Sequence, residues 1–167
     1  MQRQSVATPR WVKPQLTRLV DKAPLGNDWL HEIKYDGYRI HARLDGGQVK
    51  LLTRTGLDWS NRYRRTIKAL GKLRVKSAYS DGELCALNAD GVPTFSRLQA
   101  AMDERKTDEL VTSPSTCSTL NGKSTAGLPL LERKSRLQRV FAKEVVGLRY
   151  SEHVVGNGRP FGSRPAG

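Results

Sequence analysis

The sequence predicts an α+β fold in which antiparallel sheets are flanked by helices. Residues 38–52 alternate apolar and polar side chains around Gly46-Gly47, a pattern typical of a β-hairpin with a glycine turn. Residues 61–73 instead repeat their apolar side chains at the spacing of an amphipathic helix. The strands of a hairpin pair antiparallel, so we expect an antiparallel sheet. The apolar side of the amphipathic helix is expected to pack against it.

The other expected elements follow in order along the chain. A strand at residues 29–34 precedes the hairpin, and a strand at residues 78–87 is expected to be interrupted by its Asp-Gly pair. Two further helices and a last strand are expected at residues 95–102, 129–141 and 150–155. The polar residues 1–10 and the tail 159–167, which is rich in Gly, Pro and Arg, are expected to be disordered.

One face of the hairpin is basic. Arg39, His41 and Arg43 share it, because side chains alternate along a strand. A solvated strand surface is the simpler interpretation of this face, and a ligand-facing surface is the alternative.

The whole chain is strongly basic. Its 167 residues contain 29 Lys and Arg against 16 Asp and Glu, which gives a formal net charge of +13. This length predicts one domain or part of a larger one, and the charge favours a polyanionic partner such as nucleic acid. A run within residues 62–76 would either contact a DNA backbone or form a solvated helix face, and comprises Arg62, Arg64, Arg65, Lys68, Lys72, Arg74 and Lys76. Trp59 and Tyr63 nearby are expected to pack in the core rather than to stack on bases.

Several classes of protein are excluded by simple patterns. No window approaches eighteen consecutive apolar residues, so no transmembrane helix and no membrane partner is predicted. The first residues lack the apolar segment of a secretory signal. Cys85 and Cys117 alone provide neither a disulfide framework nor a four-ligand zinc site. A reducing cytoplasm is therefore the expected compartment.

Residues 34–39 carry the most informative motif. They read Lys-Tyr-Asp-Gly-Tyr-Arg, a match to K-x-D-G-x-R that resembles the nucleotidyltransferase superfamily of ATP-dependent DNA ligases, RNA ligases and capping guanylyltransferases. Residues 53–58, 79–84 and 95–99 resemble the R-x-G, D-G-E and F-x-x-L-Q elements that follow in that superfamily. Four motifs in the family order are far more specific than one.

The resemblance is greater to one branch of the superfamily. Residues 11–65 resemble the ligase domain of bacterial non-homologous end-joining ligases, and the likeness extends over residues 11–111 and 120–158. It implies a partial, ATP-grasp-like adenylation domain over residues 11–158, acting in DNA repair and recombination. The implied cofactors are ATP and Mg²⁺ or Mn²⁺. Double-stranded DNA with nicks or ends is the implied substrate, with end-joining proteins as further partners.

The resemblance assigns Lys34 as the nucleophile that bonds to the α-phosphate of ATP. A free lysine amine has a reference pKa of about 10.4, so a lysine nucleophile needs partial burial and cationic neighbours. Arg39 and Arg54 are the expected cations, and they would also hold the ribose and phosphates. Asp36 would order the loop, and Gly37 would let the backbone approach the ligand closely. RNA ligation or capping fits the residues around Lys34 and Arg54 less well.

Three more residues complete the implied nucleotide site. Glu32 would contact the adenine amino group, and Ile33 would lie beside it in the pocket. Glu83 would bind the ribose or help to place the metal ion. Each carboxylate by itself is more often a solvated surface residue, and it is their joint occurrence in motif order that favours a site.

Residues 112–119 depart from the family. They read Thr-Ser-Pro-Ser-Thr-Cys-Ser-Thr, and such a polar run with a proline predicts a loop. The family has there a strand resembling Phe-Ala-Phe-Asp-Leu-Leu-Tyr-Leu. Written in GC-rich codons and read one nucleotide later, that strand gives Ser-Pro-Ser-Thr-Cys-Ser-Thr, which is identical to residues 113–119. We therefore hypothesise an out-of-frame stretch that removes several buried apolar side chains.

The likeness also stops after Phe161. The family continues with a glutamate-bearing strand, a K-x-K pair and an OB domain, none of which is present in the sequence. This implies a truncated ligase-derived chain with weak or no sealing activity. The alternative is a non-catalytic, basic nucleic-acid-binding relic, and labelling of Lys34 by ATP separates the two hypotheses.

Overall fold

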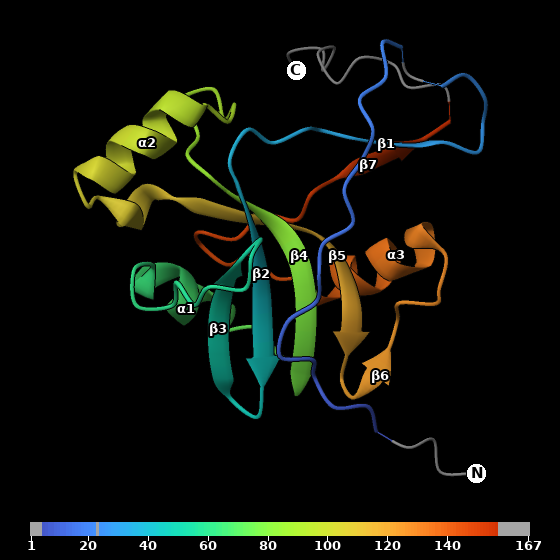
Figure 1. Ribbon diagram of the computed structural model, residues 1–167, viewed down its shortest axis with the longest axis horizontal. Helices are drawn as coiled ribbons and strands as arrows, with labels where there is room; N and C mark the ends of the chain where they lie inside the picture. Colours follow the sequence, from blue (N-terminus) through green and yellow to red (C-terminus); the bar gives the residue numbers. More distant parts are fainter. Residues whose placement is uncertain (1–4, 23, 157–167) are drawn as a thin grey trace.

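The computed structural model describes residues 5–22 and 24–156 (Figure 1). Its larger sheet has the strand order β3-β2-β4-β5-β6, and β1 pairs with β7 in a separate two-stranded sheet. Every one of these strand pairs is antiparallel, so the predicted class, α+β with antiparallel sheets, is confirmed. The elements in this part of the chain are β1 (Leu30–Glu32), β2 (Tyr38–Asp45), β3 (Gln48–Thr53), α1 (Arg64–Leu70), β4 (Ser77–Cys85), α2 (Phe95–Asp103), η1 (Thr107–Glu109), β5 (Val111–Leu120), β6 (Lys123–Ser124), α3 (Leu130–Val140) and β7 (His153–Val155).

The predicted hairpin and helices are present. The hairpin is β2–β3, and Gly46 and Gly47 form its turn with φ values of +55° and +85°. Glycine adopts such values without the strain that a β-carbon would cause. The three predicted helices coincide with α1, α2 and α3 to within a few residues. None of the described helices has both the length and the apolar character needed to cross a bilayer.

The central strand β4 runs without a break through Asp81 and Gly82, so the predicted interruption is wrong. Register shifts next to Tyr79 and Asp81 absorb the irregularity in its pairing with β5. A β-carbon on Gly82 would lie 2.4 Å from the Ser113 carbonyl oxygen and 2.7 Å from Pro114 Cα. Glycine is required at this position because the backbone of β5 passes too close for a side chain.

Strand β5 contains the polar stretch 112–119, so the loop predicted there is wrong. The stretch forms a strand because its backbone pairs antiparallel with β4, with Ser115 and Ser118 left out of the register at the two shifts. Thr112 also donates to the Gly147 carbonyl oxygen and accepts from the Arg149 N–H, and only Pro114 lacks an N–H to donate. The side chains fit less well, since the hydroxyl oxygens of Thr112, Ser113 and Ser118 are buried without a hydrogen-bond partner among the described residues. Each such group costs about 1–3 kcal/mol.

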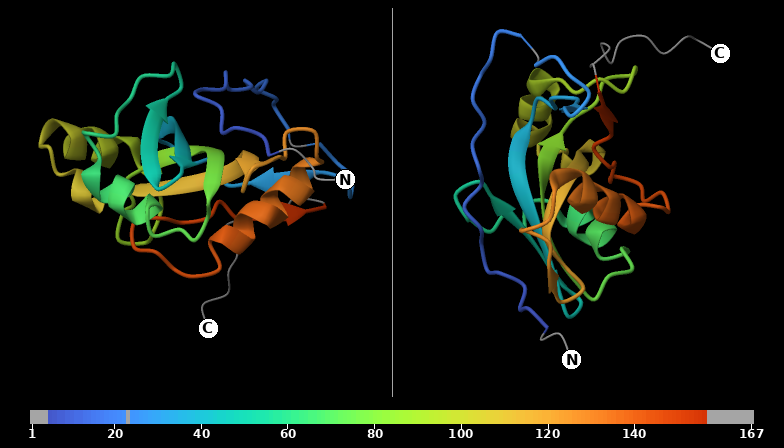
Figure 2. Two further views of the ribbon diagram at one scale, coloured as in Figure 1. Left: turned by 90° about the horizontal axis from the view of Figure 1, so that it is seen from below. Right: turned by 90° about the vertical axis from the view of Figure 1, so that its right-hand side faces the viewer.

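The hydrophobic core lies between the larger sheet and its helices. Ile40, Ala42 and Leu44 of β2 face this core and are at most 6% exposed, as the alternation predicts. Tyr63 is 1% exposed and Trp59 packs against the same cluster, which confirms core packing for both aromatic residues. Figure 2 shows α1 and α3 on one side of the sheet and the N-terminal part of the chain on the other.

Residues 5–16, here called the N-terminal segment, cross the face of the sheet opposite the core (Figure 2). Arg43 donates from Nε to the carbonyl oxygen of Pro9 over 3.0 Å. The backbone N–H of Val12 donates to the Tyr79 hydroxyl over 3.0 Å. These contacts bind an extended segment to the basic face of the hairpin.

The basic face is therefore covered rather than solvated, and the simpler prediction for it is wrong. His41, at its centre, is only 2% exposed. Residues 5–10 lie against the sheet in irregular backbone, contrary to the disorder predicted for them. The predictions for residues 1–4 and 159–167 lie outside the described residues.

Candidate active site

The loop that carries Lys34 connects the end of β1 to the start of β2. Lys34 is exposed, so the partial burial expected for it is wrong. Tyr35 is 8% exposed and holds the loop against the protein. A β-carbon on Gly37 would lie 2.3 Å from the Leu84 carbonyl oxygen, so this glycine lets the loop approach β4. The sequence predicted that Gly37 lets the backbone approach a ligand. In the structure, Gly37 instead lets the loop approach the backbone of Leu84.

Strand pairing brings Arg39 of β2 directly opposite Glu83 of β4. The Arg39 guanidinium donates from Nε to Asp81 Oδ1 over 3.0 Å, and its second terminal nitrogen lies 2.5 Å from Oδ2. The remaining terminal nitrogen donates to the carbonyl oxygen of Gln15 over 2.8 Å. Hydrogen bonding to Asp81 raises the pKa of Arg39, so the guanidinium is a fixed cation in front of Glu83.

The sequence prediction did not include Asp81. A signal was available, because Asp81 and Glu83 are two residues apart on one strand and therefore face the same side. The family likeness directed attention to Glu83 alone.

Glu83 is the centre of the charge cluster. Its Oε2 atom is buried and has no hydrogen-bond partner among the described residues. Burial raises the pKa of Glu83 to about 7, against the attraction of Arg39 and Lys34 and with the repulsion of Asp81 and Asp36. Of the predicted site residues, Arg39 lies opposite Glu83 through strand pairing, and the charges of Lys34 and Asp36 act on Glu83 from the loop before β2.

The unpartnered oxygen of Glu83 is a position for a ligand. A buried carboxylate oxygen without a donor suits a ribose hydroxyl or a divalent cation, both of which would satisfy it. The exposed Lys34 amine and the fixed Arg39 guanidinium supply positive charge on the same side. One free carboxylate oxygen beside two cations suits a polar, anionic ligand, although the described residues contain no group of three or more His, Cys, Asp or Glu side chains that could hold a metal ion by themselves.

Arg54, like Glu32 and Ile33, is a predicted site residue that no described contact joins to Glu83. It follows β3 in a tight turn, where Thr53 Oγ1 accepts hydrogen bonds from the N–H groups of Thr55 and Leu57. Its own side chain is exposed and makes no hydrogen bond or ion pair within residues 5–22 and 24–156. Gly56 in this turn has a φ of +88° and packs against the ring of Trp11 from the N-terminal segment.

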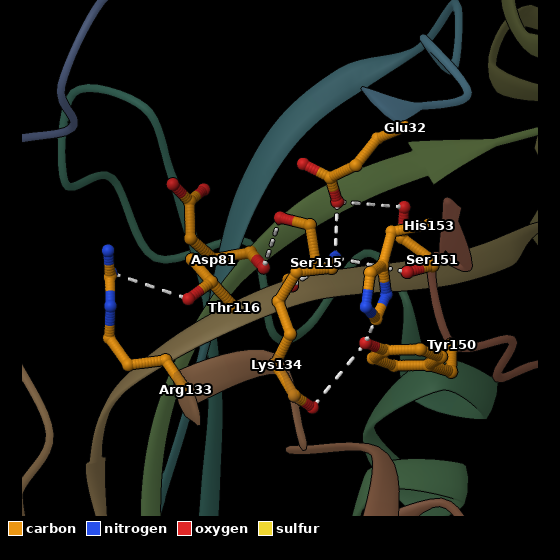
Figure 3. A network of polar contacts seen from close by, with 9 residues as sticks. All are labelled: Glu32, Asp81, Ser115, Thr116, Arg133, Lys134, Tyr150, Ser151 and His153. Atoms are coloured by element: carbon orange, nitrogen blue, oxygen red, sulfur yellow. Dashed lines mark hydrogen bonds and ion pairs between the residues drawn. The ribbon is translucent and has the colours of Figure 1, made fainter. Parts of the chain in front are cut away.

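Glu32 lies in a second polar network, which joins β1 to α3 (Figure 3). Its Oε1 atom pairs with the Nζ atom of Lys134, a side chain with no exposed surface. The same amine donates to the carbonyl oxygens of Ser115 over 2.9 Å and Ser151 over 3.1 Å. The sequence prediction missed Lys134, because a single lysine on an amphipathic helix gives no signal of burial.

Two cavities lie away from these residues. One, of about 610 Å³, is lined by residues 141–150 together with Leu87 and Val111. The other, of about 380 Å³, lies between residues 5–8 and the turns that end β2 and β5. Lys34 and Glu83 line neither of these two cavities.

The chain is similar to known DNA ligases in both sequence and structure. A family model described as "ATP dependent DNA ligase domain" matches residues 14–158. The multifunctional non-homologous end joining protein LigD of Pseudomonas aeruginosa is 35% identical over 144 residues, which are 86% of this chain and 17% of that protein. LigD of Mycobacterium bovis is 36% identical over 73 residues, or 44% of this chain and 10% of that protein.

Solved structures give the same likeness. The ligase domain of Mycobacterium tuberculosis LigD has a TM-score of 0.63 and 28% identity, and the match covers 76% of this chain and 40% of that one. A mycobacterial DNA ligase D complexed with ATP and MES has a TM-score of 0.61 and 26% identity, covering 77% and 41%. The chain thus spans well under half the length of these relatives.

Proposed function

Because this chain belongs to the family of ATP-dependent DNA ligase domains, we propose that Lys34 forms a covalent lysyl-AMP as the first step in sealing DNA breaks. The observation that supports the proposal is the pairing of Arg39 with Glu83 next to the loop that carries Lys34 and Asp36, whose charges act on Glu83. These are the residues that the motifs assign to the nucleotide site.

In the proposed step, the unprotonated Nζ atom of Lys34 attacks the α-phosphorus of ATP in line with the leaving group. A P–N bond forms, the bond from the α-phosphorus to the bridging oxygen breaks, and pyrophosphate leaves with the electron pair. One of the two amine protons passes to solvent, because Lys34 is exposed, and the other stays on the nitrogen of the lysyl-AMP. Positioning and charge neutralisation supply most of the rate in such transfers, and Arg39 provides a cation that Asp81 holds in one orientation.

We assign Glu83 to the ribose hydroxyls or to a divalent cation, and Glu32, with Ile33 beside it, to the adenine amino group. Asp36 orders the loop in this proposal, and Arg54 is placed on the phosphates by the resemblance alone. A bound Mg²⁺ or Mn²⁺ would neutralise phosphate charge and stabilise the pyrophosphate leaving group. Glu83 is the described carboxylate with a free buried oxygen suited to hold it.

The later steps involve DNA. We propose that the AMP passes to a DNA 5′-phosphate and that a neighbouring 3′-hydroxyl then displaces it, which seals the break. A net charge of +13 supports binding of double-stranded DNA with nicks or ends. The name of the Pseudomonas relative supports end-joining proteins as further partners, and DNA as the substrate supports a bacterial cytoplasmic location.

The test is incubation with ATP labelled in the α-phosphate and Mg²⁺, followed by denaturing electrophoresis. We expect label on the unaltered chain and on Lys123→Ala, which removes another exposed lysine, and none on Lys34→Ala. Asp81→Asn is expected to slow labelling about 10-fold or more, because Arg39 loses its fixed orientation. A chain that binds DNA but takes no label would instead support the non-catalytic alternative.

A further inference from the structure

Lys134 is buried in a polar cage formed by Glu32, Ser115, Tyr150 and Ser151. It extends from α3, and its side chain has no exposed surface. Its amine has three acceptors, namely Glu32 Oε1 and the carbonyl oxygens of Ser115 and Ser151, and it lies 5.2 Å from the centre of the Tyr150 ring. An ammonium group has three N–H donors, so the cage uses its whole capacity.

The cage fixes one half of the Glu32 carboxylate. Oε1 accepts from Lys134 and lies 3.5 Å from the Ser151 hydroxyl. Figure 3 shows the second carboxylate oxygen directed away from this network. Within residues 5–22 and 24–156, that oxygen, Oε2, accepts no hydrogen bond, and the side chain is 31% exposed. A single acceptor atom is thus held in one place at the protein surface, on the residue that the proposed function assigns to the adenine amino group.

A fixed acceptor distinguishes purines. An ionised carboxylate only accepts hydrogen bonds, so it pairs with the 6-amino group of adenine and repels the 6-carbonyl oxygen of guanine. Without Lys134, the Glu32 side chain would be free to rotate and would lose this discrimination. We propose that Lys134 is a positioning residue that sets base specificity through Glu32, an inference that rests on the proposed nucleotide site.

The test measures equilibrium binding of ATP and GTP by calorimetry. The unaltered chain and Arg136→Met, which changes an exposed cation on the same helix, are expected to prefer ATP to the same extent. Lys134→Met is expected to reduce the ratio of ATP to GTP affinity by about 10-fold or more. A purely structural role would weaken both nucleotides equally and leave the ratio unchanged, which would overturn the inference.

A double-mutant cycle keeps the inference testable if Lys134→Met does not fold. Because Lys134 acts through the Glu32 carboxylate, adding Lys134→Met to Glu32→Gln should not change the ratio further. An additional change in the ratio would overturn the inference. If the unaltered chain binds neither nucleotide, the proposed function fails first and the inference fails with it. If the unaltered chain prefers ATP but neither experiment supports Lys134, only the inference fails.

Discussion

Glu83 is the described carboxylate whose burial has the largest consequence for pH dependence. Burial raises its pKa to about 7, from 4.5 without the protein environment. The native state therefore binds the proton more tightly than the unfolded state, and the free energy of unfolding falls as the pH rises from about 4.5 to 7. The ionised form of Glu83 is therefore destabilised by burial, and a ligand bound to its free oxygen would offset that cost.

Glu83→Gln should remove that contribution. At pH 8 we expect the variant to be more stable than the unaltered chain, by at most about 3 kcal/mol at 1.36 kcal/mol per pKa unit, and by less because solvent still reaches the group. At pH 4 the difference should vanish. Urea unfolding at both pH values measures it, with Glu109→Gln as a control for the loss of one exposed charge. Equal stability of variant and unaltered chain at pH 8 would contradict the account.

Two buried threonines test the account of β5 at the residue scale. Thr112 is 1% exposed and its hydroxyl has no described partner, whereas Thr125 is fully buried and donates to the Cys117 carbonyl oxygen over 2.8 Å. Thr112→Val should raise the free energy of unfolding by about 1 kcal/mol, and Thr125→Val should lower it by a similar amount. Thermal unfolding measures both, and a loss of stability in Thr112→Val would show that its hydroxyl is satisfied.

Motifs indicated Lys34, Asp36, Arg39 and Glu83 because each belongs to a short string with a fixed order, and strand pairing places Arg39 opposite Glu83. The role of Lys134 could not be predicted in this way. Its amine is buried because Glu32 of β1, Ser115 of β5 and Ser151 before β7 all bind it. These residues are distant in the sequence, so the local sequence of α3 does not predict the burial.

At the scale of the element, Gly82 shows how closely β4 and β5 approach. A β-carbon there would overlap the backbone of Ser113 and Pro114, whereas one on Gly127 would meet nothing within 4 Å. Gly82→Ala should therefore cost about 3 kcal/mol or more, and Gly127→Ala should change stability by less than about 0.5 kcal/mol. Denaturant unfolding compares them, and equal effects would mean that β5 does not pair with β4 as described.

Local periodicity was sufficient to predict the β2–β3 hairpin and the three α-helices. It failed for β5 because strand formation there depends on the edge that β4 presents, and not on the β-propensity of Ser, Thr and Pro. Local periodicity also failed to predict the order of the N-terminal segment. That order depends on distant side chains, because Arg39, Arg43 and Tyr79 hydrogen-bond to the backbone of the segment. The three unpartnered hydroxyls of β5 agree with the hypothesis that its residues come from another reading frame.

At the scale of the whole molecule, the positive charge predicts salt-sensitive binding to duplex DNA. Lys68 and Lys72, at and after the end of α1, are exposed, and Lys68→Glu/Lys72→Glu should weaken binding of all DNA sequences alike. Each lost phosphate contact should reduce the slope of log affinity against log salt by about 1. Fluorescence anisotropy across a salt series measures the slope. An equal effect of Lys123→Glu/Lys143→Glu, which changes the same charge elsewhere, would mean that α1 is not the contact surface.

The central claim is that the Lys34 amine bonds to AMP, and peptide mapping by mass spectrometry after incubation with ATP and Mg²⁺ tests it most directly. We predict one adenylyl group, on the peptide that contains Lys34, removed by added pyrophosphate because the step is reversible. An adenylyl group on any other residue, or none on a chain that demonstrably binds ATP, would contradict the claim.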